Sequence, residues 1–452
     1  MNTVTRELVL LRRLCHHHRP QLKLSLALAT AGAVAATSVP TAAWAAPHHG
    51  RRVQPAFFGM HDASGLGYHH VAFGSLRIWD AGATWRDLET SPDHFDWSPL
   101  DSLVTDAQRH GVRVTLVLGM TPSFYAGSPT QPPGDLTHFS DYVRAVMQRY
   151  RDFRGRRGIE SYQVWNEGNV STFWTGSPHQ LAVLTRLVDR ARDSVDPGAT
   201  VLAPSFAARL AGQRHWISAY QSQRVSGHHV WHYYDVNAIS LYPKAAYGRR
   251  TGGPEDGIRI LEQVRTRLHR AGVPDGIPIW ATEVNYGVRS GPGGAEPARP
   301  ISRKRQVANV LRTYLLGAAR GLGRVYWYRY DWGRVVDGHT IGNTLLSDPD
   351  DWSRATSAGR ALRTAERWLT GRLVPTPGHH RACARSHRGT YTCIVRHGRH
   401  TRTILWNPQR TVRIRVADAD ARENQNGRPV ALRSGPTTVR VGYRPVMLLR
   451  HG

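Results

Sequence analysis

The sequence predicts an α/β fold, a (β/α)8 TIM barrel followed by a small C-terminal β-sandwich domain. From about residue 56 to residue 370, short apolar runs typical of buried parallel strands alternate with amphipathic helical patterns. There are eight such runs, which is the strand number of this barrel. After residue 369 the alternation stops, and short β-prone runs separated by turn residues follow.

The barrel strands are expected, in chain order, at residues 56–61, 75–79, 112–118, 161–165, 200–203, 236–241, 278–282 and 324–328. Helices are expected at residues 100–110, 139–150, 179–194, 213–223, 257–271, 302–320 and 354–369. Cap residues favour helix starts at Ser98-Pro99 and Ser140-Asp141. The first connection, residues 62–74, is too short for a full crossover helix, so the barrel departs there from the ideal pattern.

The C-terminal region begins at a Pro-Thr-Pro-Gly stretch, residues 375–378, which is typical of a linker. Strands are expected at residues 390–396, 401–406, 411–416, 437–441 and 445–449. We therefore assign residues 46–370 to the barrel and residues 371–452 to the β-sandwich domain.

The charge of the chain is unevenly distributed. The formal net charge is +27, and residues 371–452 contribute +13 of it, from 16 arginines and 3 acids. Such a surface attracts polyanions, and the candidates are an anionic cell-wall polymer, lipid headgroups or nucleic acid. No nucleic-acid-binding motif accompanies the charge, so we expect no nucleic acid partner, and a solvated basic face is the simpler interpretation. The protein is expected to be a monomer.

Residues 1–45 are expected to be a signal peptide. Basic residues precede an apolar stretch at 24–39, and Ala43-Trp44-Ala45 places small residues where a signal peptidase reads the chain. Cleavage after Ala45 predicts a secreted or envelope-associated protein; the alternative is that the segment remains as an anchor. The apolar stretch is short for a mature transmembrane helix.

Cysteine use agrees with export. Cys15 would be lost with the signal, which leaves Cys383 and Cys393 on two short β-prone segments around a turn. This arrangement predicts a hairpin disulfide in an oxidising compartment. Two free, buried thiols are the alternative.

Two glutamates carry the chemical information in the barrel. Glu167 lies in Ser-Tyr-Gln-Val-Trp-Asn-Glu-Gly-Asn and Glu283 in Pro-Ile-Trp-Ala-Thr-Glu-Val-Asn-Tyr. Each falls where a predicted buried strand ends, and the carboxyl ends of barrel strands are where this fold keeps its chemistry. One glutamate at a strand end is usually a salt-bridged structural acid. Two, on the fourth and seventh strands, indicate a pair that acts together.

Such a pair suits glycoside hydrolysis, in which one carboxyl protonates the leaving oxygen and the other attacks the sugar carbon. We expect Glu167 to be the general acid and base, with a pKa raised by burial or by a second carboxylate. Glu283 would be the ionised nucleophile, and Asn166 can bind the sugar 2-hydroxyl. A retaining enzyme needs a carboxyl separation of ~5–5.5 Å, an inverting one ~6.5–9.5 Å.

The chain resembles the clan A glycoside hydrolases, which are retaining enzymes with an Asn-Glu acid/base on strand four and a nucleophilic Glu on strand seven. It is most similar to family 39, with family 5 next. The resemblance covers residues 55–370 and includes the segments at 76–80, 85–89 and 95–97. The segments at 427–430 and 441–446 resemble the β-sandwich that commonly follows such barrels.

The resemblance implies three further site residues. Arg77 would orient the nucleophile, Tyr242 would touch it, and Trp327 would form the floor of the sugar site. The alternatives are a core ion pair for Arg77 and packed barrel residues for the other two. Ser240 stands where family members often carry a His, so the sugar is left open.

Other side chains near the predicted strand ends could contact substrate. They are His61, Asp62, Trp79, Phe124, Trp174, Tyr286, Tyr330 and Trp332.

We therefore expect an exported retaining glycosidase that acts on an extracellular or cell-wall polysaccharide or oligosaccharide. No metal or organic cofactor is expected, because the histidine clusters, such as His228-His229 and His379-His380, have no partners at ligand spacing. The alternatives are a non-catalytic carbohydrate- or wall-binding protein on a degenerate barrel, and a transglycosylase.

Overall fold

The computed structural model describes residues 50–61, 71–243, 252–288, 300–329, 344–347, 354–433 and 435–452. The expected signal peptide, most of the first connection, and Asp62, Tyr330 and Trp332 lie outside the described residues. Within the described part of the chain, no helix is both long and apolar enough to cross a membrane.

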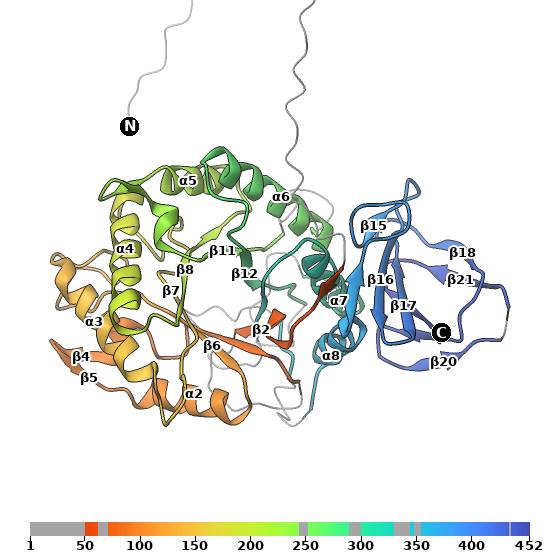
Figure 1. Cartoon of the computed structure of the whole chain (residues 1–452), viewed down its shortest axis with the longest axis horizontal. Helices are drawn as coiled ribbons and strands as arrows, with labels where there is room; N and C mark the ends of the chain where they lie inside the picture. Colours follow the sequence, from red (N-terminus) through yellow and green to blue (C-terminus); the bar gives the residue numbers. More distant parts are fainter. Residues whose placement is uncertain are drawn as a thin grey trace, which may run out of the picture. The chain divides into compact units, whose positions relative to one another are not determined.

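Eight parallel strands close into a barrel whose order follows the chain (Figure 1). They are β2 (Phe58–His61), β3 (Ser75–Ile78), β6 (Arg113–Val117), β7 (Ser161–Gln163), β8 (Thr200–Ala207), β11 (Val236–Ser240), β12 (Ile279–Val284) and β13 (Val325–Tyr328). The last strand, β13, pairs with the first, β2, and so completes the ring. This confirms the barrel and the position of every predicted strand, although β8 and β12 extend further than expected.

Helices surround the barrel, and most of them present an apolar stripe to the strands and polar residues to solvent. The long ones are α2 (Ser98–Arg109), α3 (Leu136–Tyr150), α4 (Pro178–Val195), α5 (Ala211–Gln221), α6 (Pro254–Arg270), α7 (Arg303–Ala319) and α8 (Ser357–Leu369). The short elements are η1 (Pro55–Phe57), α1 (Trp85–Leu88), β4 (Glu89–Ser91), β5 (His94–Phe95), β9 (Arg224–Val225), β10 (His228–His229) and η2 (Val230–Tyr233).

One predicted helix start is confirmed and the other is wrong. Helix α2 begins at Ser98, as expected, although the Ser98 hydroxyl donates to Asp96 Oδ1 at 2.6 Å instead of capping the helix. Helix α3 begins at Leu136, four residues before Ser140. Its cap is Asp135, whose carboxylate accepts from the Thr137 backbone N–H at 2.9 Å, so the helix starts at a cap residue upstream of the serine.

The C-terminal region forms two β-layers. The larger sheet has the order β1-β14-β16-β17-β22-β19-β20, with β15 paired to β16, and the smaller one contains β18 and β21. The strands are β1 (Arg51–Arg52), β14 (Arg372–Val374), β15 (Ala384–Arg385), β16 (Tyr391–His397), β17 (His400–Trp406), β18 (Val412–Val416), β19 (Ala421–Asn424), β20 (Pro429–Ala431), β21 (Thr437–Val441) and β22 (Val446–Arg450). An apolar cluster that includes Leu405, Val439 and Leu448 joins the layers, as expected of a sandwich. Strand β1 precedes the barrel in the chain, so the larger sheet draws on both ends of the described protein.

The predicted disulfide is present. Cys383 and Cys393 are bonded, and both are fully buried. Cys393 lies in β16, while Cys383 directly precedes β15, which pairs with β16. The bond therefore closes the hairpin that the spacing predicted.

A buried ion pair attaches the C-terminal sheets to the barrel. Arg312 of α7 donates through Nε to Glu255 Oε1 at 2.9 Å and also contacts Oε2 through Nη2. Trp406 of β17 donates its indole N–H to the same carboxylate at 2.9 Å, and Tyr443 lies against the guanidinium, with its ring centroid 4.2 Å from Arg312 Cζ. Arg312 is almost completely buried, so its charge is removed from water. The ion pair with Glu255 offsets the cost of that burial.

We expect Glu255→Ala to lower the free energy of unfolding by about 3–5 kcal/mol, because it leaves a buried guanidinium unpaired. Chemical denaturation of the whole chain measures this. The control is Arg259→Ala, which removes an exposed ion pair with Asp256 in the same helix and should cost at most about 1 kcal/mol. Similar losses in the two variants would contradict the role of Glu255.

Candidate active site

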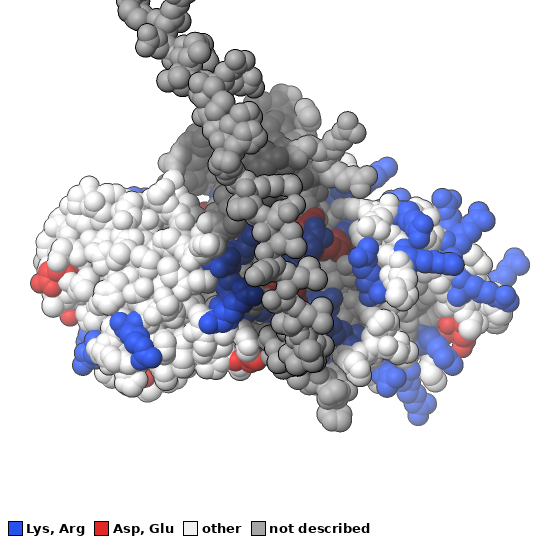
Figure 2. All heavy atoms as spheres, turned by 90° about the horizontal axis from the view of Figure 1, so that it is seen from above, with Lys and Arg blue, Asp and Glu red and all other residues white. Residues whose placement is uncertain are grey.

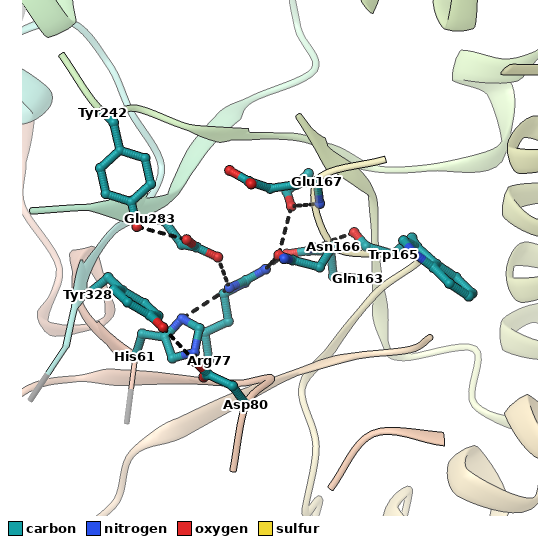
Figure 3. Close-up of polar contacts among 11 residues, drawn as sticks. His61, Arg77, Asp80, Gln163, Trp165, Asn166, Glu167, Tyr242, Glu283 and Tyr328 are labelled. Carbon is teal, nitrogen blue, oxygen red and sulfur yellow. Dashed lines mark hydrogen bonds and ion pairs between the residues drawn. The ribbon is translucent and has the colours of Figure 1, made fainter. Parts of the chain in front are cut away.

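Five of the predicted site residues meet at the carboxyl ends of the barrel strands (Figure 3). Arg77 lies on β3 and Glu283 near the end of β12. Asn166 and Glu167 follow β7, and Tyr242 follows β11. Because parallel barrel strands all end on one face, these side chains are brought together although up to about 200 residues separate them in the chain.

The guanidinium of Arg77 is the centre of the polar contacts at this face. It is fully buried and donates through Nη1 to Glu283 Oε1 at 2.9 Å, through Nη2 to Asn166 Oδ1 at 2.6 Å and through Nε to Gln163 Oε1 at 2.9 Å. The predicted contact of Arg77 with Glu283 is therefore present. One side chain connects β3, β7 and β12.

Glu283 has a donor on each carboxyl oxygen. Arg77 occupies Oε1, and the hydroxyl of Tyr242 donates to Oε2 at 2.8 Å. Tyr242 thus lies where the resemblance implied, against the proposed nucleophile. Two such donors stabilise the carboxylate form of a buried glutamate.

Glu167 sits in a strained backbone conformation that a serine holds in place. Its φ is 37°, in a region that residues other than glycine rarely adopt. Its backbone N–H donates to Ser205 Oγ at 2.8 Å, and the N–H of Gly168 donates to the Ser205 carbonyl at 3.0 Å. The Ser205 hydroxyl in turn donates to Asn166 Oδ1 at 3.2 Å. Strand β8 therefore fixes the turn that aims Glu167.

Burial and mutual repulsion perturb the two carboxyls. Burial raises the pKa of Glu167, and this outweighs the opposing effects of the Ser240 hydroxyl, Arg209 and Arg77. Burial also raises the pKa of Glu283, while the Arg77 charge opposes the rise and the Glu167 charge adds to it. Coupled carboxyls lose their protons in steps, so over a range of pH the pair holds one proton. The donors on Glu283 favour the charge there, which leaves the proton on Glu167.

Asn166 keeps a free donor beside the carboxyls. Its Oδ1 accepts from Arg77 and Ser205, which leaves the Nδ2 amide without an acceptor among the described residues. A sugar hydroxyl could accept from that amide, in the role the sequence predicted for Asn166. Figure 3 shows the Glu167 carboxylate turned toward the side of the site where Tyr242 and Glu283 lie.

Trp327 lies on β13 but is completely buried. Its indole N–H donates to the Thr344 carbonyl at 2.9 Å, and its ring packs at a tilt against Tyr286. These contacts are those of a packed barrel residue, so a sugar contact for Trp327 stays a prediction.

The other suggested substrate contacts differ in exposure. His61, Trp79, Trp174 and Tyr286 are buried, and Phe124 is 40% exposed. Of the described members, Phe124 is therefore the one with an open aromatic face.

His61, suggested as a substrate contact, instead contacts Arg77 and Asp80. Sequence patterns missed four residues that shape the site. These are Asp80, Gln163, Ser205 and Tyr328, which make polar contacts with the predicted residues or with each other. They lie on or directly after barrel strands, and nothing in their local sequence distinguishes them from packed strand residues. Within the described residues, no three His, Cys, Asp or Glu side chains are arranged to hold a metal ion.

No protein-family model matches the sequence, and no curated protein matches it. Solved structures do match. A glucosidase from Croceicoccus marinus has a TM-score of 0.63 at 13% identity, over 90% of this chain and 97% of that one. A GH39 β-xylosidase from Caulobacter crescentus has a TM-score of 0.61 at 15% identity, over 89% and 98%.

A GH39 enzyme from Xanthomonas axonopodis pv. citri has a TM-score of 0.60 at 14% identity, over 89% of this chain and 96% of that one. At these identities the likeness is one of fold, and it confirms the resemblance to family 39 at that level. The resemblance to family 5 stays a prediction.

The raised pKa of Glu167 has a consequence for stability. The folded protein holds this proton more tightly than the unfolded chain, so the group favours folding below its ordinary pKa and loses that contribution as pH rises through the raised value. We therefore expect Glu167→Gln to be more stable than the wild type at pH 7 and equally stable near pH 4. The gap should be about 1.4 kcal/mol for each unit by which the pKa is raised.

Chemical denaturation at the two pH values measures this difference. Asp141→Asn, which removes an exposed carboxylate from α3, is the control and should change stability little at either pH. A Glu167→Gln variant that is no more stable than the wild type at pH 7 would contradict the protonated state assigned to Glu167.

Proposed function

We propose that this chain is a retaining glycoside hydrolase in which Glu167 is the general acid and base and Glu283 is the nucleophile. The observation that carries the proposal is the pair itself. Glu283 holds a donor on each oxygen, which suits an ionised group, while buried Glu167 has a raised pKa, which suits a proton donor. One ionised and one protonated carboxyl at the carboxyl ends of barrel strands are the two groups that the reaction needs.

In the first step, a carboxylate oxygen of Glu283 attacks the anomeric carbon while Glu167 gives its proton to the departing glycosidic oxygen. The products are a glycosyl ester on Glu283 and a free alcohol. In the second step, Glu167, now ionised, takes a proton from water, whose oxygen attacks the same carbon and releases Glu283 as a carboxylate. Asn166 Nδ2 would donate to the sugar 2-hydroxyl as charge develops on the ring.

We propose an extracellular or cell-wall polysaccharide or oligosaccharide as substrate, reached by export through residues 1–45. The similar structures include a glucosidase and a β-xylosidase, so aryl glucosides and aryl xylosides are the first substrates to test. We propose that the protein acts as a monomer and without a cofactor. Ser240, which lies in β11 opposite Glu283, leaves the identity of the sugar open.

We expect Glu283→Ala to lose activity by about 10⁴-fold or more, because no covalent intermediate can form. Azide, which fits the space left by the carboxylate, should restore turnover and give a glycosyl azide of inverted configuration. Glu167→Gln should slow substrates with alkoxide leaving groups far more than nitrophenyl substrates, whose leaving group needs no proton.

Steady-state kinetics and nuclear magnetic resonance of the products measure these effects. Glu262→Gln, which replaces a half-buried acid on α6 outside the site, is the control and should retain activity. Substantial turnover by Glu283→Ala without azide, or inverted products from the wild type, would contradict the mechanism.

We also propose that the C-terminal domain binds an anionic cell-wall polymer through β18 and β21. Arg413 on β18 lies directly opposite Arg440 on β21, and Arg415 is the next outward residue on β18. All three are exposed, while Val439, Val441 and their neighbours face the core. Opposed like charges cost stability, and an anionic chain along the strands would relieve that cost.

The acids of the C-terminal domain do not pair with the arginines of β18 and β21. Asp418 pairs with Arg450, Glu423 pairs with Arg367, and Asp420 accepts from the backbone of His451. Figure 2 shows basic side chains gathered over the C-terminal part of the molecule. The outward residues of β18 and β21 include no aromatic ring, the group on which single-stranded nucleic acid stacks, so a polymer of sugar or polyol phosphates suits this surface better.

Replacing Arg413, Arg415 and Arg440 by Gln should weaken binding to a poly(glycerol phosphate) chain at least tenfold. It should also lower the slope of log affinity against log salt by about 2–3 units, because three contacts are lost. The matched control replaces Arg109, Arg144 and Arg190, which are exposed on α2, α3 and α4. Equal weakening in both triple variants would contradict a localised binding surface, and tighter binding to single-stranded DNA would favour a nucleic acid.

A further inference from the structure

His61 lies at the end of β2, behind the guanidinium of Arg77 (Figure 3). Its side chain is completely buried, and both ring nitrogens are engaged. Nδ1 is 3.1 Å from Arg77 Nη1, and Nε2 contacts Asp80 Oδ1. The edge of Tyr328 packs against the ring, with centroids 4.5 Å apart. His61 therefore has no free polar atom with which to bind a substrate.

The contacts of His61 allow one protonation state. An arginine nitrogen can donate but cannot accept, so Nδ1 must be the unprotonated, accepting nitrogen. The remaining hydrogen is then on Nε2, where it is donated to Asp80. A proton on Nδ1, whether in the other tautomer or in the imidazolium, would place two N–H groups against each other in a buried site. His61 is thus a neutral imidazole with the proton on Nε2.

Asp80 supplies the charge that keeps the proton there. Its carboxylate accepts from His61 and from the Tyr328 hydroxyl, the latter at 2.6 Å. Burial alone would raise the pKa of Asp80, but the hydrogen bonds from His61 and Tyr328 and the nearby charge of Arg329 lower it. Asp80 is therefore ionised. The contacts run from the Asp80 carboxylate through the imidazole of His61 and the guanidinium of Arg77 to the Glu283 carboxylate.

The imidazole completes the set of acceptors that orients Arg77. The two hydrogens on Nη1 go to different partners, one to Glu283 at 2.9 Å and the other to His61. Without an acceptor at Nδ1, one of these N–H groups would be buried and unsatisfied, which is unfavourable. The guanidinium would relieve that cost by turning, and Glu283 would move with it.

We propose that Asp80 and His61 form a positioning pair, in which Asp80 holds the His61 ring through the Nε2 hydrogen and His61 fixes the plane of Arg77 and thereby the attacking carboxylate of Glu283. The inference rests on the proposed role of Glu283 as nucleophile. Both ring nitrogens of His61 are engaged, so His61 does not bind the sugar itself. The pair therefore affects the rate of attack by Glu283 more than the binding of substrate.

Two nearly isosteric substitutions separate the two sides of the imidazole. In His61→Asn, the amide oxygen can take the place of Nδ1 and accept from Arg77, but the link to Asp80 is lost. In His61→Gln, the amide nitrogen can take the place of Nε2 and donate to Asp80, but no acceptor remains for Arg77. We expect His61→Asn to keep the rate of glycosyl-enzyme formation within about tenfold and His61→Gln to lose about 100-fold, with KM little changed in both.

Stopped-flow measurement of the first turnover on an aryl glycoside, together with the free energy of unfolding, tests this. The proposal would be overturned if the rate fell equally in both variants, in proportion to their loss of stability. A change confined to KM would also overturn it. If the wild type cleaves no glycoside, the proposed function is wrong, and the nitrogen shifts of His61 then test the positioning pair without any activity.

A second measurement needs no activity. In the whole chain labelled with ¹⁵N-histidine, the signals missing from His61→Asn identify His61. We expect an unprotonated Nδ1 and a protonated Nε2 in the wild type. In Asp80→Asn the carboxylate acceptor of Nε2 is lost while Arg77 still donates to Nδ1, so we expect the Nε2 shift to change and Nδ1 to stay unprotonated. An imidazolium pattern in the wild type, or no change in Asp80→Asn, would overturn the assignment.

Discussion

The buried guanidinium of Arg77 is the constraint on which the rest of the site depends. A charge that is fully removed from water must be paired and hydrogen-bonded, and Arg77 meets this requirement with acceptors from three other barrel strands and the loops that follow them. Those acceptors are side chains that the chemistry needs in fixed places, Glu283 and Asn166 among them. The contacts that pair the buried charge of Arg77 therefore also bring the residues of the candidate active site together.

The site is held at a cost that the surrounding fold offsets. Glu167 combines a strained φ of 37° with a buried carboxyl whose raised pKa lowers stability at neutral pH. Ser205 on β8 stabilises the strained turn from the neighbouring strand. Elsewhere the chain adds anchors that take no part in the chemistry, such as the Glu255–Arg312 pair that attaches the C-terminal sheets and the disulfide between Cys383 and Cys393.

Most of the barrel was predictable because its signals are local. Buried strands show as apolar runs and helices as a 3.6-residue period, so all eight strands lay where expected. The misses have local causes too. Helix α3 starts early because Asp135 caps it before Ser140 can. Strands of two or three residues, such as β1 and β14, are too short to show any period, and β1 joins its sheet only through pairing with a segment over 300 residues away.

By itself the sequence determined the barrel, the order of its strands and the two glutamates at their ends, because each of these leaves a pattern within a few neighbouring residues. It could name Arg77 and Tyr242 only through resemblance. The tertiary structure alone decided that Ser205 holds the turn of Glu167 and that His61 and Asp80 stand behind Arg77. These roles depend on donors and acceptors from different strands meeting within about 3 Å in a buried space, and such meetings leave no trace in the sequence near any one of the residues.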